Sequence, residues 1–164
     1  MKKQRFDELA QDVSDEDFKD FVGIKAYNFL GAKNKLASGK NSDDFSFAAL
    51  LFGGFYGAYY KYWTPMITFT VGVLAIVILV EDAENHENYS KGLTLLLSIF
   101  WGVYFNASYV KHSYKKIAQL KKMEDDPARL KVLLGKKGGT SILHLILSLF
   151  LAGLVGMLLF ADGN

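Results

Sequence analysis

Apolar residues gather along this chain in long blocks that are separated by charged segments. Three blocks, residues 62–80, 92–110 and 141–160, contain no Asp, Glu, Lys or Arg. Each has the roughly 20 mostly apolar residues that a helix needs to cross a bilayer. A soluble helix of this length would usually keep one polar face. The pattern therefore predicts an all-α integral membrane protein with three transmembrane helices, which together form a membrane domain over residues 62–160.

A fourth apolar stretch, residues 45–61, precedes the first predicted span and differs from the spans in composition. Nine of the 19 residues from position 45 to position 63 are Phe, Tyr or Trp. Tyr and Trp favour the headgroup level of a bilayer. The glycines at positions 53, 54 and 57 permit a bend or a close helix contact. We therefore expect an aromatic interfacial or re-entrant helix here, followed by Pro65 in the first turn of the first span.

The charges of the connecting segments orient the predicted spans. Residues 81–91 contain four acids and one lysine, whereas residues 111–139 contain nine Lys or Arg. The positive-inside rule makes residues 111–139 a cytosolic basic loop, with the N-terminus cytoplasmic and the C-terminus outside. A fourth span at residues 45–60 would export either this loop or the eight Lys and Arg of residues 1–44. Three spans satisfy the rule in every connecting segment.

Residues 1–44 predict a cytosolic polar helical region. Ser14 and Asp17 have the spacing of a capping box. The apolar side of the helix that follows is predicted to contain Phe18, Phe21, Val22 and Tyr27. From position 31 onward the stretch GAKNKLASGKNSDD predicts an irregular connector.

The basic loop suggests a role at the membrane surface. Five lysines follow the second span directly: Lys111, Lys115, Lys116, Lys121 and Lys122. Each cation near an anionic leaflet contributes about 1 kcal/mol, so anionic lipid headgroups are the expected contact and a protein-binding platform is the alternative. Asp126 as cap and Pro127 at the first helical position predict a short helix that Gly135 ends. Because topology accounts for the positive charge, no nucleic-acid partner is expected.

Enzyme and metal motifs do not emerge from the sequence. The chain has no cysteine, which excludes disulfides, thiolate metal sites and cysteine nucleophiles. No G-x-S-x-G, H-E-x-x-H or phosphate-loop pattern occurs. An exposed acidic loop explains His86, between Glu84 and Glu87, better than a metal site does. We expect no catalytic residue, no cofactor and no metal site.

Small and polar residues recur every four positions within the predicted spans, so each span presents them on one helix face. The members are Thr64, Thr68 and Gly72; Thr94, Ser98, Gly102 and Asn106; and Ser148, Ala152 and Gly156. Such faces let another helix approach closely, either inside a three-helix bundle or in a second copy of the chain. For Asn106 a structural hydrogen bond is favoured over a ligand contact. For His144 an interfacial or packing role is favoured over proton transfer.

The stretch FSFAALLFGGFYGAYYKYW resembles the pattern F-N-W-A-A-F-F-F-G-P-x-W-x-x-Y-R-K-x-Y of a family of small bacterial inner-membrane proteins classed as a domain of unknown function. The matching positions are Phe45, Ala48, Ala49, Phe52, Gly53, Tyr59 and Lys61. Two further elements are similar: Phe21, Gly23 and Tyr27 resemble F-x-G-x-x-x-x-Y with one residue fewer before the tyrosine, and Asn106, Tyr109 and His112 fit N-x-x-Y-x-x-H. The chain departs from the family at Phe47, Gly54 and Tyr60, where the family has Trp, Pro and Arg. The likeness covers most of residues 21–160 and implies a bacterial three-span protein without supplying an activity.

The sequence thus favours a non-enzymatic inner-membrane protein that acts as an interaction or accessory subunit and self-associates. Its expected partners are anionic lipids at the basic loop and a second copy or another membrane protein. The alternative is a small oligomeric channel or transporter, although the scarcity of ionisable groups in the spans weighs against ion coupling. The candidate interaction residues are Phe45, Phe52, Gly53, Tyr59, Lys61, Ser98, Gly102, Asn106, Tyr109, His112, Ser148, Ala152 and Gly156.

Overall fold

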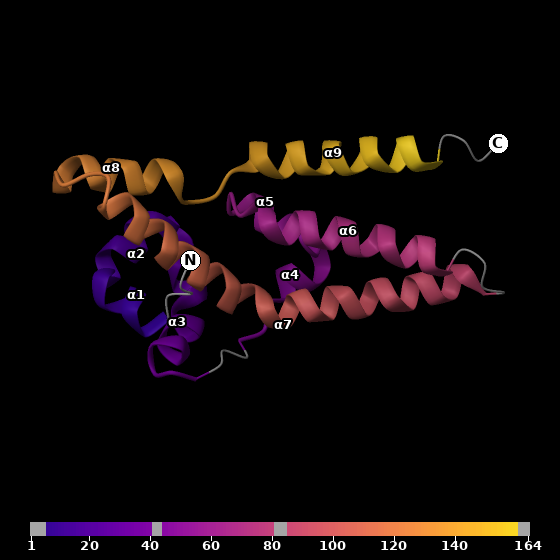
Figure 1. The fold of residues 1–164 in the computed structure, drawn as a ribbon, viewed down its shortest axis with the longest axis horizontal. Helices are drawn as coiled ribbons and strands as arrows, with labels where there is room; N and C mark the ends of the chain where they lie inside the picture. The colour runs from indigo at the N-terminus through magenta and orange to yellow at the C-terminus, as the bar shows by residue number, and fades with distance from the viewer. Residues whose placement is uncertain (1–5, 41–43, 81–84, 161–164) are drawn as a thin grey trace. The chain divides into compact units, whose positions relative to one another are not determined.

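The computed structural model describes residues 6–40, 44–80 and 85–160, apart from the side chains of residues 7–9, 155, 156 and 158–160. Every regular element in these residues is a helix (Figure 1). Three stretches are long and apolar enough to cross a membrane. They are α6 (Trp63–Val80), α7 (His86–Lys121) and the apolar part of Pro127–Leu154. The all-α expectation and the three long apolar helices are therefore confirmed.

The third apolar helix is α9 (Ile142–Phe160), since residues 138–141 are not helical and separate it from the charged α8 (Pro127–Lys137). The observed α6 and α9 each begin one residue after the predicted start of their span. The second helix is longer than its predicted span, because α7 has 36 residues and continues beyond position 110 into the predicted basic loop. Neither Gly nor Pro occurs from position 103 to position 121, so nothing in the sequence stops the helix there.

The chain forms two compact units, and each is built from two separated segments. We call the first the charged unit; it consists of Met1–Phe45 and Val103–Thr140. The second, the apolar unit, consists of Ser46–Gly102 and Ser141–Asn164. Helix α7 therefore supplies its first part to the apolar unit and its second part to the charged unit.

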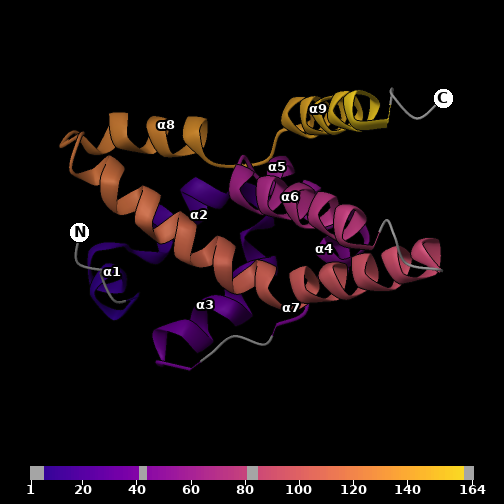
Figure 2. The same cartoon turned by 45° about the vertical axis from the view of Figure 1, so that its right-hand side comes forward.

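The charged unit contains α1 (Phe6–Asp12), α2 (Asp15–Val22), the 3-10 helix η1 (Gly23–Phe29), α3 (Leu30–Ala37), the second part of α7, and α8. Figures 1 and 2 show α1, α2 and α3 beside this part of α7. The ring of Tyr109 lies 4.6 Å from that of Phe29 and 6.0 Å from that of Phe105. The buried side chains include Phe18, Phe21, Val22, Phe29, Phe105, Tyr109, Val110, Ile117 and Leu134. These side chains form the apolar core of the charged unit.

The capping box that starts α2 is confirmed. The Ser14 hydroxyl accepts from the Asp17 N–H (3.1 Å), and the Asp17 carboxylate accepts from the Ser14 N–H (3.0 Å). Tyr27, however, is 67% exposed, so its predicted place on the apolar side of this helix is wrong. The reason is that η1 begins at Gly23 and turns the chain away from the face of α2.

Two predicted boundaries in the charged unit are also wrong. The irregular connector predicted from position 31 is helical as far as Ala37, because α3 covers its first half. Helix α8 does begin at Pro127 with Asp126 as its cap, but it continues past Gly135 to Lys137. The end falls at Gly138 because this residue meets the backbone of Phe21, a distant contact described below.

The apolar unit contains α4 (Phe47–Phe52), α5 (Phe55–Tyr59), α6, the first part of α7, and α9. Helix α5 lies against α4, α6 and α9. Helix α6 contacts α7 where a Cβ atom at Gly72 would stand 2.9 Å from the Leu97 side chain. With six and five residues, α4 and α5 are each far too short to cross a bilayer, which removes the fourth span from consideration.

Candidate functional site

Three glycines bring the aromatic segment against the first turns of α6. Gly53 ends α4 with φ +53°, a conformation that favours glycine, and a Cβ atom there would lie 2.6 Å from the Phe69 ring. A Cβ atom on Gly54 would overlap the Pro65 carbonyl oxygen and stand 2.5 Å from the Phe69 Cβ. At Gly57 it would stand 2.6 Å from the Tyr62 carbonyl oxygen. No larger residue fits these positions without moving α5 away from α6.

The chain reverses between α5 and α6 through a tight turn centred on Lys61. The N–H of Tyr62 donates to the Gly57 carbonyl (2.9 Å), and the N–H of Lys61 donates to the Ala58 carbonyl (2.9 Å). This pair of bonds is a Schellman motif, in which the residue at the Lys61 position is usually glycine. Lys61 has φ +56° and is the one non-glycine residue with positive φ in the described part of the chain. The turn therefore holds a lysine in a conformation that costs about 1 kcal/mol or more.

Three tyrosine rings cluster at this end of α5. Tyr56 stacks on Tyr59 with ring centroids 6.4 Å apart, and Tyr60 meets these rings edge-on at 5.1 and 5.2 Å. The hydroxyl groups of Tyr56 and Tyr60 share a hydrogen bond of 3.2 Å. The cluster thus has an apolar body and a hydroxyl-bearing tip, as side chains at the headgroup level of a membrane do.

The first turn of α9 is fastened to this cluster. The Ser141 N–H donates to the Tyr59 carbonyl (2.7 Å), and the Ser141 hydroxyl caps α9 by accepting from the His144 N–H (3.3 Å). The same hydroxyl lies 2.8 Å from the His144 Nδ1, and the imidazole packs beside the Trp63 ring at 5.6 Å. These contacts support the packing role expected for His144.

The start of α4 is fastened to α7 within the apolar unit. The Ser46 N–H donates to the Gly102 carbonyl (2.7 Å), while the Ser46 hydroxyl caps α4 by accepting from the Ala49 N–H (3.2 Å). Ala49 is fully buried, whereas Phe52 remains 58% exposed. Phe45, the last residue of the charged unit's first segment, is 49% exposed.

Two adjoining cavities, of about 180 and 310 Å³, form what we call the aromatic groove, beside α4, α5 and α9. The smaller is lined by Phe52, Tyr56, Tyr59 and Leu145. The larger is lined by Leu51, Phe52, Gly53, Phe55, Phe69, Leu145 and Leu149. The two cavities adjoin at Phe52 and Leu145, which line both, and every side chain that lines them has an apolar body.

Most of the predicted small-residue stripes face inward. On α7, Ser98 is partly buried and Gly102 is buried; on α9, Ser148 is buried and Ala152 is partly buried. The surroundings of Gly156 lie outside the described residues. Packing within the chain therefore accounts for these positions of α7 and α9. On α6, by contrast, Thr64 and Thr68 are exposed.

The predicted residues Asn106, Tyr109 and His112 lie in the second part of α7 within the charged unit, where the first two contact the N-terminal segment. The Asn106 side-chain amide donates to the Asp44 carbonyl (3.2 Å), a structural bond of the expected kind. Tyr109 is fully buried against Phe29. His112 lies beyond the predicted span, and burial, helped by the nearby lysines, lowers its pKa to about 4.

Sequence reasoning missed an acidic centre on α2. Three of its carboxylates pair with lysines from three other helices. The pairs are Asp15 with Lys33 of α3, Asp17 with Lys121 of α7 (2.9 Å), and Asp20 with Lys131 of α8 (3.8 Å). Partial burial would raise the pKa of Asp17, but hydrogen bonds from Lys121 and Ser14 outweigh it and lower the pKa. Lys121, predicted to meet lipid headgroups, is therefore engaged inside the charged unit.

A second missed feature is the glycine pair at positions 138 and 139. The Gly139 N–H donates to the Phe21 carbonyl (2.6 Å), and a Cβ atom at Gly138 would overlap the same carbonyl oxygen. The pair therefore closes the charged unit by bringing the end of α8 onto the end of α2. No group of three or more His, Cys, Asp or Glu within the described residues is placed to hold a metal ion.

Residues 23–115 match the profile of a protein family of unknown function, DUF2628. The chain belongs to this family. The matched residues run from η1 through the aromatic segment and α6 into the second part of α7. They therefore contain the three glycines of the aromatic segment, the Lys61 turn and Asn106. They end before α8 and α9, whereas the resemblance was expected to reach position 160. No curated protein and no solved structure matches the chain.

Proposed function

We propose that this chain is a non-enzymatic, three-span membrane protein that acts as an interaction or accessory subunit and presents its charged unit to the cytosol. The observation that carries the proposal is that this unit is assembled from two separated segments of the chain. Residues 1–45 and 103–140 fold together, joined by Asp17 to Lys121 and by Phe21 to Gly139. Segments that share one core lie on the same side of a membrane, so the chain crosses an even number of times between them.

This requirement supports the topology expected from the charges. Two crossings, by α6 and the first part of α7, return the chain to the side on which it started, and α9 then leads to the other side. A further crossing by residues 45–60 would separate the two halves of the charged unit. The net positive loop and the positive-inside rule favour the cytosol, and a bacterial inner membrane, for this side.

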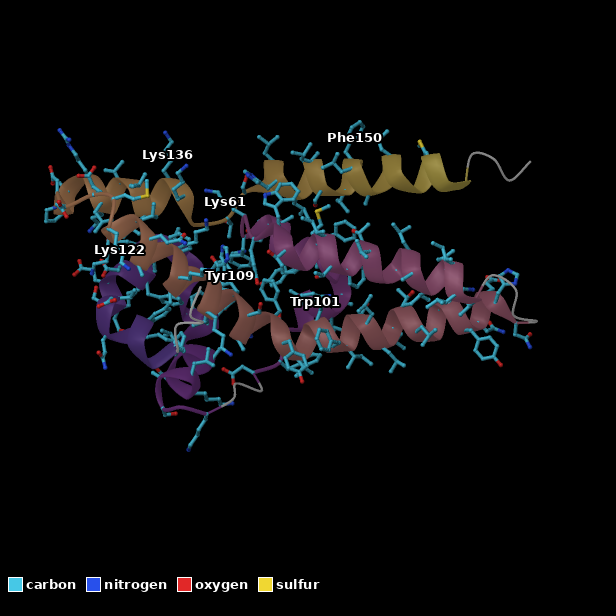
Figure 3. All side chains as sticks on the ribbon, in the orientation of Figure 1. Lys61, Trp101, Tyr109, Lys122, Lys136 and Phe150 are labelled. Atoms are coloured by element: carbon cyan, nitrogen blue, oxygen red, sulfur yellow. The ribbon has the colours of Figure 1, made fainter. Side chains whose placement is uncertain are left out.

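The exposed apolar side chains of α9 support the proposal that lipid or another protein surrounds this helix. Its exposed apolar side chains include Ile142, Leu143, Ile146, Phe150 and Met157, which are between 58% and 72% exposed. Figure 3 shows Phe150 projecting outward from α9. Burying one side chain of this size contributes about 1.5–3 kcal/mol, so five of them correspond to about 8–15 kcal/mol, as much as the whole stability of a typical domain. Helix α9 therefore needs lipid or protein against it.

Reporter fusions test the topology. A fusion after Glu87 should report the outside, and a fusion after Lys122 should report the cytosol. Because the chain has no cysteine, Asp17→Cys with Lys121→Cys provides a second test through a short bismaleimide crosslinker. Efficient crosslinking within one chain is expected. Reversed reporters would contradict the orientation, and failure of the crosslink would contradict the shared core.

Self-association is proposed through the exposed faces of α6 and α9. Single-cysteine variants at Thr68 and Leu143, which are both exposed, should give crosslinked dimers in native membranes. Ser148→Cys is the matched control, because Ser148 is buried in the same unit. Native mass spectrometry that shows only monomers, together with no protein captured after crosslinking in cells, would contradict the interaction role.

A channel or transporter formed by several copies is the alternative, and within the described residues no observation favours it. The side-chain amide of Asn106, the amide within the second predicted span, donates to the Asp44 carbonyl. The hydroxyl of Thr68 bonds to the Thr64 carbonyl (2.9 Å) of its own helix.

A further inference from the structure

The 3-10 helix η1 exposes a row of apolar side chains on the charged unit. A 3-10 helix has three residues per turn, so residues three apart lie in one row along it. Ala26 and Phe29 form a row that is buried in the core of the unit. The members of a second row are exposed: Ile24 (97%), Tyr27 (67%) and, at the start of α3, Leu30 (37%). Ile24 is the most exposed large apolar side chain in the described part of the chain.

The end of η1 packs against the last turns of the second predicted span. The ring of Phe29 lies 4.6 Å from the ring of Tyr109 and 6.5 Å from the ring of Phe105. Both of these α7 residues belong to the apolar block of residues 92–110, whose cytosolic end lies at the surface of the bilayer in the proposed topology. Phe29 therefore holds η1 at the depth where α7 leaves the bilayer.

The start of η1 lies beside the entry to the third span. A Cβ atom on Gly23 would stand 4.0 Å from the Gly139 Cα, and the Gly139 N–H donates to the Phe21 carbonyl (2.6 Å). Helix α9 begins three residues after Gly139, at Ile142. Ile24 directly follows Gly23, so it stands close to the residues from which α9 enters the membrane. Both ends of η1 are thus attached to chain segments that lead into the bilayer.

We propose that η1 inserts its exposed row into the cytosolic leaflet, at the boundary between the lipid headgroups and the acyl chains. The proposal rests on the three-span topology, which places α7 and α9 in the membrane. Interfacial segments bury an apolar face about 5–10 Å into this boundary. Tyr27, with an apolar ring and a hydroxyl tip, suits the headgroup level, and Ile24 and Leu30 suit the acyl side. A protein partner fits less well, because a stable interface uses about 20–30 residues a side and this row has three side chains.

Fluorescence quenching in nanodiscs tests the insertion in the full chain. Because the chain has no cysteine, each single-cysteine variant can carry one NBD label. The discs contain phosphatidylglycerol and phosphatidylethanolamine, with a fraction of phospholipid that carries a nitroxide near the start of its acyl chain. The label at Ile24→Cys should be quenched at least about threefold more than the label at Met123→Cys, since an inserted row reaches the depth of the nitroxide. Iodide in solution should quench the two labels in the opposite order.

Met123 is the matched control because it is an exposed apolar residue of the same unit that lies away from the membrane. It is 79% exposed and follows the end of α7. At 1.5 Å per residue, α7 continues for about 24 Å from Phe105 to Lys121 before Met123 is reached. A label there reports the solvent around the charged unit.

A label at Phe150→Cys, on the outward face of α9, separates the possible failures (Figure 3). Lipid quenching at position 150 but not at position 24 would overturn the insertion of η1 and leave the spans in place. No lipid quenching at either position would overturn the three-span topology itself. A label at position 24 that neither the lipid nitroxide nor iodide quenches would show that protein covers the row, which also overturns the insertion.

A charge placed in the row provides the second arm. With the label at Tyr27→Cys, Ile24→Asp should reduce the lipid quenching by about half or more, because a carboxylate is costly among acyl chains. Ile24 is almost fully exposed, so this variant should keep the helix content measured by circular dichroism. Met123→Asp adds the same charge to the same unit and should leave the quenching unchanged. Equal loss in the two variants, or no loss in Ile24→Asp, would overturn the proposal.

Discussion

Replacing Gly54 with alanine should separate α5 from α6 and lower the stability of the apolar unit. The backbone of Gly54 has φ −64° and ψ −22°, which alanine adopts without strain. The new methyl group, however, would overlap the Pro65 carbonyl oxygen and lie 2.5 Å from the Phe69 Cβ. Carbon atoms in contact are about 3.5–4.0 Å apart, so α5 has to shift by at least about 1 Å.

The expected cost follows from two opposing effects. Overpacking of a tight contact costs about 1–3 kcal/mol. The upper half of this range applies here, because one of the overlapping groups is the Pro65 backbone carbonyl, which cannot rotate away as a side chain can. Alanine regains about 0.4–1 kcal/mol relative to glycine, because it has less backbone freedom in the unfolded chain. The net loss is therefore about 1–2 kcal/mol. For a chain of this size, that corresponds to a fall of roughly 2–8 °C in the melting temperature.

Thermal unfolding in a mild detergent, followed by circular dichroism at 222 nm, measures this loss. Gly153→Ala is the matched control, because Gly153 lies in α9 of the same unit and a Cβ atom there would have no neighbour within 4 Å. The control should melt at or above the wild-type temperature. If Gly54→Ala also melts there, the close approach of α5 to α6 does not constrain the protein and the reasoning is refuted.

Three further outcomes follow from the turn and from the charged unit. Lys61→Gly should raise stability by about 1 kcal/mol in the same melting assay, because glycine carries no penalty at positive φ; a loss would show that the lysine side chain contributes more than its backbone costs. The folded pKa of Asp17 is lowered, so its pairing stabilises the charged unit above the ordinary value of 3.8 and the stabilisation is lost as the pH falls through the folded value. Asp17→Asn should therefore flatten the acid limb of the stability curve below about pH 5, and an unchanged acid limb would count against the Lys121 pair. Gly138→Ala should cost about 1–3 kcal/mol and speed amide exchange in α2 and α8, because its methyl group overlaps the Phe21 carbonyl; unchanged exchange would disprove the contact.

Local rules predicted the features that depend on neighbouring residues. The capping box of Ser14 and Asp17 and the start of α8 at Asp126 and Pro127 depend on spacings of one to three residues, and both are present. The extent of α7 was missed because a span is counted from apolar residues, whereas a helix continues until a breaker stops it. The last turns of α7 are amphipathic, with Ile117 and Leu120 buried and Lys115 and Lys116 exposed.

Features that depend on contacts between distant residues could not be predicted from the sequence. The glycines of the aromatic segment could be recognised as permissive, but their actual neighbours, Pro65 and Phe69, are set by the fold. No sequence pattern indicated the role of Gly138, because its contact with Phe21 joins residues more than 100 positions apart. The small-residue spacing in α7 and α9 identified a helix face correctly but left open whether the chain itself or a partner covers it.

The two-segment construction of the charged unit imposes an order on its folding. Its N-terminal helices complete their core with the second part of α7 and with α8, which are synthesised after the whole of Ser46–Gly102. At about 5–20 residues per second, that delay lasts roughly 3–11 s. During this time the core around Phe18, Phe21 and Phe29 is incomplete, so these side chains stay exposed until the second part of α7 is made.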